Sequence, residues 1–555
     1  MQMCIGAEIF VVMADPTEPT SFEEAVHPEN AYRDKWIDAM IEDIEGKMKN
    51  GEKGAWSLED LDTVLKEGRK PMKGKWVFKL KYDEHGVVAR FKARWVACGY
   101  SQIEGEDYSE TFSPTLKGTT IRMALAEFAA RDLEINGIDV VKAFTLSKMD
   151  EKLYVEQPHG FEVPGKVCLL NQALEGTKQA ANLWQANLSK YIVEKEGMTR
   201  STIDPCLYTK FEDGAEIILI VWVDDLCIGT TTQQMFEDFF ERFSKEYSST
   251  KNKSPTFVGI DMKRDRSKKT ITLNQTRYVE KLFDRFLSER NTKPWKTPSG
   301  TSREEATRFM NISPPTDDNG VHRMAGNMYL KLMGALLYAA CMTRPDIAFH
   351  VSFLCRLMST PSKEAYDAGL AVLSYLHQTK EMGLTYGGKS PCIDPDSNSH
   401  VQLIVHADSS FGQSPYPYGG GFVEFRGAAI SWHSRRHKTP PQSTWEAELS
   451  VMIAMIKESI FAKNIGEDMK VKLETTHVLT DSKSAYDTVR NPGATKKSTH
   501  VERWLMFARD LYLTKAIGLT LVPTHRMMAD GMTKVVDKDK FFKCRDYAMG
   551  IEENW

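Results

Sequence analysis

Two adjacent aspartates, Asp224 and Asp225, stand directly behind the apolar run Ile217–Val223, and a second apolar run, Leu226–Gly229, follows them. Two such runs around a short polar interruption predict two strands that meet at a tight turn, with the carboxylate pair at its tip. Paired acids at the end of a buried hairpin suit a two-metal nucleotidyl-transfer site, because divalent cations bridge phosphates through hard oxygen ligands held close together. A solvated Asp-Asp turn is the alternative, and the pair taken alone favours it.

The composition is that of a globular chain without a membrane span. The 555 residues predict roughly three or four domains. Apolar residues make up 41% and charged residues 27%, with no apolar stretch of about 18 residues and no signal peptide. The nine cysteines are scattered, without a Cys-x-x-Cys pair, which argues for reduced intracellular thiols and against a disulfide scaffold or a structural zinc site.

Charge is segregated along the chain although the net charge is only −4. Residues 15–62 carry fourteen acids against five bases, whereas residues 66–94 carry ten bases against three acids. A second basic run spans His433–Lys438. Local basic surfaces rather than net charge determine phosphate affinity, so nucleic acid remains a candidate partner, with a solvated face as the alternative for each run.

Hydrophobic spacing predicts helices, a hairpin and two connectors. The predicted helices are Asn30–Lys49, Thr119–Arg131, Gln179–Glu194, Thr276–Leu287 and Tyr329–Met342. The hairpin pairs Lys75–Lys81 with Val87–Ala97 across a turn at Asp83–Gly86, and Glu134–Val141 is a further strand. Residues 291–318 and 387–399 are rich in Pro, Ser and Gly or charge and read as connectors, the latter being the better domain boundary.

A third acid, Asp139, ends the strand Glu134–Asp139, 85 residues before Asp224. On a neighbouring strand it would complete a triad for two Mg²⁺ ions. Ordered motifs surround these acids: Lys75–Lys79, Arg90–Ala97, Tyr108–Pro114, Ile138–Phe144, Leu153–Phe161, Gly176–Trp184 and Val223–Asp225, then Gly259–Asp265 and Thr343–Ala348. This set resembles the reverse transcriptase of copia-type LTR retrotransposons, and the resemblance runs from Pro19 to the C-terminus.

The resemblance implies a role for several residues. Asp139 and Asp224 would be the principal metal ligands and Asp225 the third carboxylate. Phe144 would form an aromatic wall that excludes a ribose 2′-hydroxyl, or else be a core aromatic, and Gln179 would contact the incoming nucleotide. Lys79, Lys92 and Arg94 are candidates for binding triphosphate or template phosphates. Trp222 stands where the family usually has tyrosine, and Glu175, Thr177 and Cys98 are further departures.

A second set of acids lies beyond residue 400. Asp408 ends the predicted strand Val401–Ser410, a helix opens near Ser443, Asp481 follows the strand His477–Thr480, and Asp530 comes last. Acids in the order Asp, Glu, Asp, Asp on strand, helix, strand and helix resemble the RNase H site, which would hold two further Mg²⁺ ions for hydrolysis of the RNA strand of a hybrid.

Several assignments in this second set stay open. Ser443-x-x-Glu446 is a capping-box pattern, which leaves Glu448 as the favoured ligand over Glu446. His525 stands where related enzymes have a mobile histidine, or it is a surface loop residue. Arg435, Arg436 and Lys438 would face the phosphates of the hybrid, with Trp222 as a further nucleic-acid contact at the first site.

Together these features predict an α+β chain: a right-hand polymerase (fingers, palm and thumb) followed by an RNase H-like α/β domain. The expected ranges are an acidic helical segment (1–62), fingers and palm (63–250), thumb and connection (251–390) and the RNase H-like domain (400–555). The resemblance implies RNA-directed DNA polymerase and ribonuclease H activity with Mg²⁺ or Mn²⁺, two per site.

The expected partners are an RNA template, a DNA primer strand or priming tRNA, RNA–DNA hybrid and dNTPs, with no membrane. Integrase and capsid of the same element are further candidates, and the expected location is a cytoplasmic virus-like particle, with nuclear entry also open. The alternatives are a degenerate or domesticated copy that binds nucleic acid without catalysis, and a structural component of the particle.

Overall fold

The structure, a computed structural model, describes residues 17–82, 87–252, 256–288, 290, 294–300, 302–314, 327–387, 401–411, 417–491 and 501–551. The chain divides into two compact units, one of residues 1–114, 140–197 and 243–250 and the other of residues 115–139, 198–242 and 251–555. None of the helices in the described ranges has the length and apolarity needed to cross a bilayer. No disulfide joins the cysteines that the structure describes.

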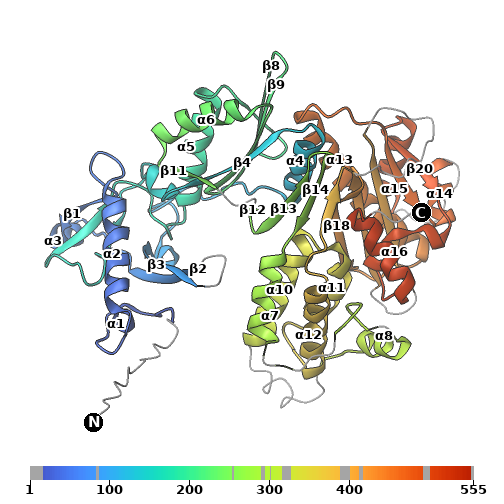
Figure 1. Ribbon diagram of the computed structural model, residues 1–555, viewed down its shortest axis with the longest axis horizontal. Coiled ribbons are helices and arrows are strands. Elements are labelled where there is room, and N and C mark those ends of the chain that lie inside the picture. Colours follow the sequence, from blue (N-terminus) through green and yellow to red (C-terminus); the bar gives the residue numbers. More distant parts are fainter. Residues whose placement is uncertain are drawn as a thin grey trace, which may run out of the picture. The chain divides into compact units, whose positions relative to one another are not determined.

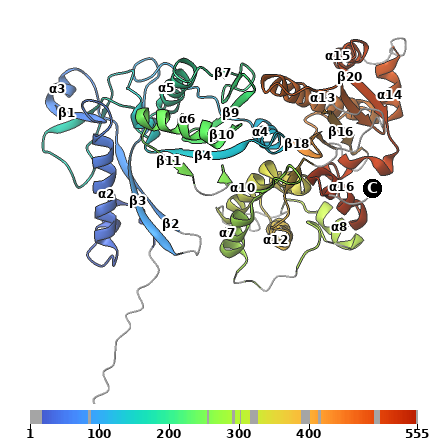
Figure 2. The ribbon, with the colours of Figure 1, turned by 45° about the horizontal axis from the view of Figure 1, so that its top comes forward.

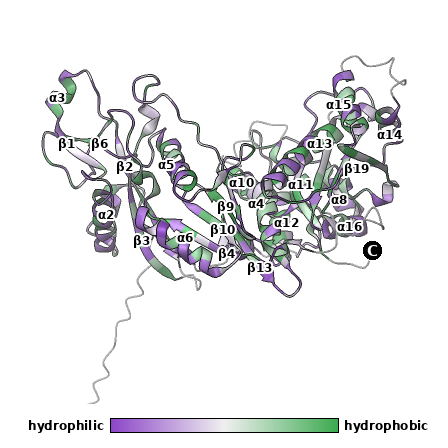
Figure 3. Cartoon of the chain, turned by 90° about the horizontal axis from the view of Figure 1, so that it is seen from above, coloured by the Kyte–Doolittle hydropathy of each residue, from purple (hydrophilic) through white to green (hydrophobic). Residues whose placement is uncertain are grey.

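The first unit contains the predicted hairpin and the acidic helix. Strands β2 (Gly74–Tyr82) and β3 (Val88–Ala97) pair antiparallel with Trp76 opposite Trp95. Alternation along the two strands places Trp76, Phe78, Ala93 and Trp95 on one buried face. Helix α2 (Arg33–Met48) packs on β3 and buries Trp36 and Met40 in the same core, and it is banded with hydrophilic and hydrophobic residues in Figure 3.

The remaining elements of the first unit are short apart from one helix. Strands β1 (Trp56–Asp60), β6 (Lys166–Leu170) and β5 (Tyr154–Val155) form a sheet in that order. The helices are α1 (Phe22–Ala25), α3 (Leu61–Lys66), η1 (Gly99–Ser101), η2 (Ala143–Leu146) and α5 (Ala180–Glu194). Helix α5 and the hairpin match the ranges that the sequence predicts to within one residue at each described end, and the turn at Asp83–Gly86 lies outside the described residues.

A six-stranded sheet carries the first aspartates. Its order is β11-β4-β10-β9-β8-β7, which places β4 (Glu134–Val140) beside β10 (Asp225–Thr230) and β10 beside β9 (Ala215–Trp222). Strands β8 (Leu207–Glu212), β7 (Thr199–Arg200) and β11 (Ser249–Asn252) extend it. Helix α4 (Gly118–Ala130) packs on β9, and α6 (Gln233–Glu246) follows β10.

A second sheet and a group of helices follow in the second unit. The sheet has the order β12 (Thr256–Phe257), β13 (Ile260–Asp265), β14 (Thr270–Asn274) and β15 (Leu384–Tyr386). Helices α7 (Thr276–Phe286), α10 (Asn327–Met342), η3 (Pro345–Ile347), α11 (Ala348–Cys355) and α12 (Lys363–Gln378) share one hydrophobic core, and α7, α10 and α12 lie side by side in Figures 1 and 2. Residues 291–318 are not purely a connector, because α8 (Arg303–Met310) forms within them, with a capping box at Ser302 and Glu305.

The motif Thr343–Ala348 has a structural role in this helical group. Arg344 forms a two-pronged ion pair with Asp346, with N···O distances of 2.9 and 2.7 Å. The Tyr375 hydroxyl on α12 donates to Asp346 at 2.6 Å, and Arg344 donates to the carbonyl of Thr379. Both charged side chains are almost fully buried, so the pair fixes η3 to the end of α12.

The last part of the chain is a five-stranded mixed sheet with helices. Its order is β18 (Ala428–Arg436), β17 (Tyr418–Phe425), β16 (Leu403–Ser409), β19 (Thr476–Thr480) and β20 (Ile517–Leu521), with β16, β19 and β20 parallel. Helix α13 (Thr444–Asp468) packs on β16 and β17 (Figure 1). The other helices are α14 (Lys483–Arg490), α15 (Glu502–Leu513), η4 (Thr524–Arg526), η5 (Met528–Met532) and α16 (Lys538–Met549). The predicted boundary at residues 387–399 lies almost wholly outside the described residues.

Helix α4 shares one hydrophobic core with this last sheet. The fully buried Arg122 donates from Nε to the carbonyl of Ile430 on β18 at 2.7 Å, and from Nη1 to the carbonyls of Cys341 and Met342. Its guanidinium lies 4.2 Å from the ring centroid of Trp432. The apolar residues of α4, β9, β16, β17 and α13 belong to a single buried cluster, so the two sheets are parts of one packed body.

Candidate functional site

The first aspartates meet at one end of the six-stranded sheet. Asp225 lies opposite Trp222 across the β9–β10 hairpin, so Val223 and Asp224 form its two-residue loop. On its other side Asp225 lies directly opposite Asp139 on β4. Because directly paired residues project from the same face, Asp139 and Asp225 point to one side of the sheet. The structure therefore brings the three acids together and places Asp225, rather than Asp224, opposite Asp139.

The environment of Asp225 opposes its ionisation. Burial first, then the negative charges of Asp224 and Asp139, raise the pKa of Asp225 to about 6. A divalent cation among the three oxygens would relieve that repulsion. The turn also stores strain, since Val223 has φ +55°, a conformation that β-branched residues rarely adopt.

Two predicted nucleotide contacts lie in the first unit. Phe144, on η2, is partly buried against the core of that unit, in keeping with the core alternative. Gln179 has no exposed surface: it accepts from Gln102 at 2.9 Å and donates to the carbonyl of Asp107 at 2.9 Å. Its carboxamide is committed to internal bonds in this conformation, and a nucleotide contact stays a prediction.

Lys79, Lys92 and Arg94 share one face of the β2–β3 hairpin. Lys79 lies directly opposite Lys92, and Arg94 is two residues further along β3, so strand alternation turns all three away from the tryptophan face. Like charges placed directly opposite destabilise a hairpin, and a bound anion would remove that cost. Glu18 supplies one such anion, since its carboxylate contacts Lys79 Nζ at 2.5 Å and accepts from the amide of Leu80.

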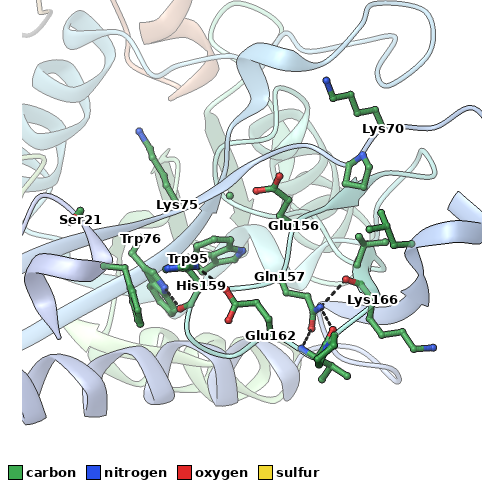
Figure 4. Close-up of a pocket in the computed structure, with 18 of the residues that line it drawn as sticks. Ser21, Lys70, Lys75, Trp76, Trp95, Glu156, Gln157, His159, Glu162 and Lys166 are labelled. Carbon is green, nitrogen blue, oxygen red and sulfur yellow. Dashed lines mark hydrogen bonds and ion pairs between the residues drawn. The ribbon is translucent and has the colours of Figure 1, made fainter. Parts of the chain in front are cut away.

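A groove of about 820 Å³ lies on the other side of the same hairpin (Figure 4). Trp76 and Trp95 form part of its wall, and the Trp76 indole donates to the carbonyl of His159 at 3.0 Å. Lys70 and Lys75 also line it. The Gln157 side chain at its edge is fully engaged with the backbone of Val163 and Lys166, which fixes the groove's rim.

Glu175, one of the departures from the family pattern, has a structural partner. Its carboxylate lies 3.3 Å from Nζ of Lys47, a side chain of α2 with no exposed surface. Lys47 also pairs with Asp43 at 2.8 Å and donates to the carbonyl of Trp95. The acidic helix α2 is thus tied to the hairpin by buried charges, and Glu175 completes that network.

The second set of acids forms a compact cluster. Within the described part of the chain, Asp408, Glu448 and Asp481 form a group in which one carboxylate oxygen from each residue lies within 4.8 Å of the other two. Asp408 lies on β16, Glu448 in the first turns of α13, and Asp481 directly after β19. Parallel pairing of β16 with β19 brings the first and last of these to the same edge of the sheet. Three hard oxygen donors at this spacing fit Mg²⁺ or Mn²⁺.

The structure distinguishes the two glutamates of α13. Glu446 accepts from the amide of Gln442 at 2.8 Å, and its own amide donates to the Ser443 hydroxyl, so it serves the helix terminus. Glu448 is buried in the cluster, where burial first, then Asp408 and Asp481, raise its pKa to about 9. Burial is also the main cause that raises the pKa of Asp408 to about 6.

Asp530 differs from the other three acids. It lies on the 3₁₀ turn η5 and not on an α-helix as predicted. Lys534 Nζ lies 2.5 Å from its Oδ1 and Lys540 Nζ lies 3.1 Å from its Oδ2. Neither lysine is among the site residues predicted from the sequence, although the i,i+4 spacing of Asp530 and Lys534 is typical of such a pair. His525 lies exposed on η4.

The basic run on β18 does not form one face. Arg435 and Arg436 are consecutive, exposed strand residues, so their side chains leave opposite faces of the sheet. Lys438 is exposed beyond the strand end. Trp222, the predicted contact at the first site, is partly buried against the shared core. Contacts of these four residues with nucleic acid remain a prediction.

The architecture defines a class of protein. A hairpin with two aspartates opposite a third on the adjacent strand is the palm arrangement of a template-dependent polymerase. The five-stranded mixed sheet that carries Asp408 and Asp481 has the RNase H-like topology. The predicted fold class, a right-hand polymerase followed by an RNase H-like domain, is therefore confirmed.

Comparison with known proteins agrees with this class. Residues 56–299 match the family described as "Reverse transcriptase (RNA-dependent DNA polymerase)". The Pol polyprotein from transposon TNT 1-94 of Nicotiana tabacum is 32% identical over 98% of this chain, and that from transposon RE1 of Arabidopsis thaliana is 28% identical over 96%. The chain spans 40% and 34% of those polyproteins.

Among solved structures, a foamy viral protease-reverse transcriptase in complex with double-stranded DNA is similar over 84% of this chain and 68% of its own, with 14% identity and a TM-score of 0.43. Residues 56–299 belong to the reverse transcriptase family, and the chain as a whole is similar to Pol polyproteins of plant copia-type transposons. The predicted resemblance is confirmed.

Proposed function

We propose that this chain is an RNA-directed DNA polymerase with ribonuclease H activity that copies retrotransposon RNA into cDNA. The observation that carries the proposal is the placement of Asp225 opposite Asp139, with Asp224 beside it at the hairpin tip. The second carboxylate cluster, on an RNase H-like sheet, supports the nuclease half.

The donor set at each site fits two Mg²⁺ or Mn²⁺ ions. At the first site Asp139, Asp224 and Asp225 would hold them, and at the second Asp408, Glu448 and Asp481, with Asp530 as the fourth predicted ligand. When bound, such ions supply a nucleophile at neutral pH and neutralise charge on the phosphate that reacts. The raised pKa values of Asp225 and Glu448 support this proposal, because neighbouring carboxylates repel one another when ionised and a bound cation would neutralise that repulsion.

The residues of the chain would bind and orient the substrates. Lys79, Lys92 and Arg94 present three cations on one hairpin face, suited to phosphates of the nucleotide or template. Phe144 would exclude a ribose 2′-hydroxyl. In the nuclease half, Arg435, Arg436 and Lys438 would contact the phosphates of the hybrid, and His525 would assist water attack or product release. Gln179 and Trp222 complete the proposed contacts.

The proposed partners follow from this chemistry: an RNA template, a DNA primer strand or priming tRNA, RNA–DNA hybrid and dNTPs. Integrase and capsid of the same element are proposed as further partners within a cytoplasmic virus-like particle that later gives access to the nucleus.

Primer extension on an RNA template with Mg²⁺ tests the polymerase half. We expect extension by the natural chain and at least about a hundredfold less by Asp224→Asn, because one oxygen donor is lost at the metals. The matched control is Asp213→Asn, which removes an exposed carboxylate from the turn at the other end of β9. No extension by any of the three proteins would refute the polymerase and favour the degenerate or domesticated alternative.

Cleavage of an RNA–DNA hybrid tests the nuclease half. We expect Asp481→Asn to abolish it while primer extension persists. Cleavage that persists in Asp481→Asn would contradict the assigned site.

A further inference from the structure

The acidic stretch 15–62 supplies no ligand to either carboxylate site, yet it contacts the basic hairpin β2–β3. The Glu18 carboxylate lies 2.5 Å from Nζ of Lys79, and the Glu42 carboxylate pairs with the guanidinium of Arg90. The two acids belong to different elements, because Glu18 precedes α1 and Glu42 lies on α2. The stretch therefore places carboxylates on two separate cations of the hairpin.

One face of the hairpin carries five cations. Directly paired residues project from the same face, and the pairs here are Lys79 with Lys92 and Lys81 with Arg90. Arg94, two residues further along β3, projects from that face as well. We call these five residues the cationic face. Glu18 and Glu42 thus neutralise two of its five charges.

The acidic stretch also binds the backbone of the hairpin. In the described part of the chain β2 and β3 form a two-stranded sheet, so each strand has one edge whose amides face no strand partner. Glu18 accepts from the Leu80 amide on the β2 edge at 3.0 Å. Asp43 accepts from the Trp95 amide on the β3 edge at 2.9 Å. A carboxylate therefore lies on each outer edge of the hairpin.

These carboxylates differ in how easily they can leave. Asp43 is buried and pairs with Lys47, which has no exposed surface, so its contacts hold α2 on the hairpin. The other two pairs lie at the surface, where Lys79 is 60% and Arg90 is 56% exposed. Exposed ion pairs contribute little to stability, so Glu18 and Glu42 can be displaced from the hairpin at small cost.

The Glu18 carboxylate occupies the place that a phosphate group would take. Its two oxygens contact an ammonium group and a backbone amide, and both kinds of donor bind phosphate oxygens in complexes with nucleic acids. Burial opposes its ionisation, but the hydrogen bonds from Lys79 and the Leu80 amide hold the pKa of Glu18 below its ordinary value. Glu18 is therefore an anion at neutral pH and competes with any phosphate for Lys79.

Resting on the polymerase function proposed above, we infer that Glu18 and Glu42 are internal competitors of nucleic acid at the cationic face. In the free chain they neutralise Lys79 and Arg90. A nucleic-acid strand displaces them, because its phosphates contact several of the five cations at once and release bound counterions. The acidic stretch thereby weakens binding of nucleic acid to the hairpin, and only a strand that engages the face at several positions overcomes it.

Fluorescence anisotropy with a fluorescein-labelled oligouridylate tests this competition on the full chain, with EDTA present to remove divalent cations. We expect Glu18→Gln to lower the Kd about threefold and Glu18→Gln with Glu42→Gln to lower it about tenfold. Glu29→Gln removes the same charge from an exposed residue of the stretch and should change the Kd less than about twofold. An unchanged or raised Kd in the double variant would overturn the inference.

A double-mutant cycle shows whether the gain in affinity arises at Lys79. On a Lys79→Gln background, Glu18→Gln should change the Kd less than about twofold, because the cation for which Glu18 competes is absent. Both side chains lie at the surface, so neither substitution removes a core contact. A gain as large as in the natural chain would show that Glu18 acts through overall charge, and would refute the competition.

Primer extension by the same proteins separates this inference from the proposed function. If the variants bind the oligouridylate in the expected order but the natural chain extends no primer, the inference stands and the polymerase function fails. If the natural chain extends a primer while the Kd is the same in all variants, the competition is refuted and the polymerase function stands.

Discussion

Glu448 links stability to pH at the residue scale. Its pKa is raised from 4.5 to about 9, by burial first and then by Asp408 and Asp481. Between these two values the folded chain holds a proton that the unfolded chain has released. The unfolded state thus binds fewer protons, and the free energy of unfolding falls as pH rises. The stabilisation is complete below pH 4.5 and is lost as pH rises to about 9.

We therefore expect the melting temperature of the metal-free protein to fall by about 5 °C or more between pH 5 and pH 9, as differential scanning calorimetry can measure. Mn²⁺ should oppose the fall, because a bound cation favours the ionised carboxylates. Glu448→Gln should flatten the profile. An equally steep profile in that variant would show that another group dominates.

The buried pair of Arg344 and Asp346 is the second consequence at this scale. Removal of one partner leaves an unpaired charge buried in the protein. Asp346→Ala should therefore lower the free energy of unfolding by about 3–5 kcal/mol, as measured by urea denaturation. Asp367→Ala breaks the exposed pair with Lys363 and should cost less than about 1 kcal/mol. A similar small cost for Asp346→Ala would contradict the assigned role of this motif.

At the element scale, the β9–β10 hairpin combines function with strain. Val223 has φ +55°, in the left-handed region that glycine adopts without steric cost. Val223→Gly should raise the free energy of unfolding by about 1 kcal/mol, the balance of released strain and greater freedom in the unfolded chain. Val221→Gly, in the adjoining strand, is the control and should destabilise, because it removes a buried side chain. Destabilisation by both substitutions would show that the Val223 turn is not strained.

Periodic elements were predictable because their pattern is local. The predicted helix Thr119–Arg131 differs from α4 by one residue at each end, and the predicted strand Glu134–Val141 differs from β4 by one residue at its C-terminal end. The short helix α8 was missed, since eight residues between turn-forming segments give little periodicity. The motifs placed the acids near the ends of β4 and β16 and at the start of β10, because these strands read as apolar runs with an acid at one end.

Long-range partners were not predictable in the same way. Nothing local in the sequence shows that Lys540 reaches Asp530, or that Glu175 reaches Lys47, because these contacts depend on how the elements pack. The same applies to Gln179, whose burial follows from its bond with Gln102, 77 residues away. A sequence motif identifies the residue, but the packing of the elements determines whether its side chain is free to contact a ligand.

At the scale of the whole molecule, the shared core makes the second unit one folding body. Arg122 donates to three carbonyls of β18 and α10. Arg122→Met should lower the free energy of unfolding by about 3 kcal/mol or more, since a hydrogen bond to a charged group contributes about 1.5–3 kcal/mol. Arg277→Met, at an exposed pair with Asp261, should cost less than about 1 kcal/mol in the same urea titration. Comparable costs for the two substitutions would contradict the role of Arg122 in joining α4 to β18 and α10.

Residues 400–555 expressed alone should fail to fold cooperatively, because they share their hydrophobic core with α4. The face of β18 and α13 that packs on α4 would be exposed, and we expect dye binding and a broad thermal transition. A sharp transition in the isolated segment would show that α4 is dispensable.

The contacts of Arg122 with β18 and α10 also have an evolutionary consequence. A hybrid of two related chains joined between α4 and β18 would place Arg122 against a β18 surface that arose in another lineage. Such hybrids should be lost unless the residues at positions 122 and 432 arrive from the same parent. Lineages should therefore inherit α4 and β18 together, however freely the surface around them changes.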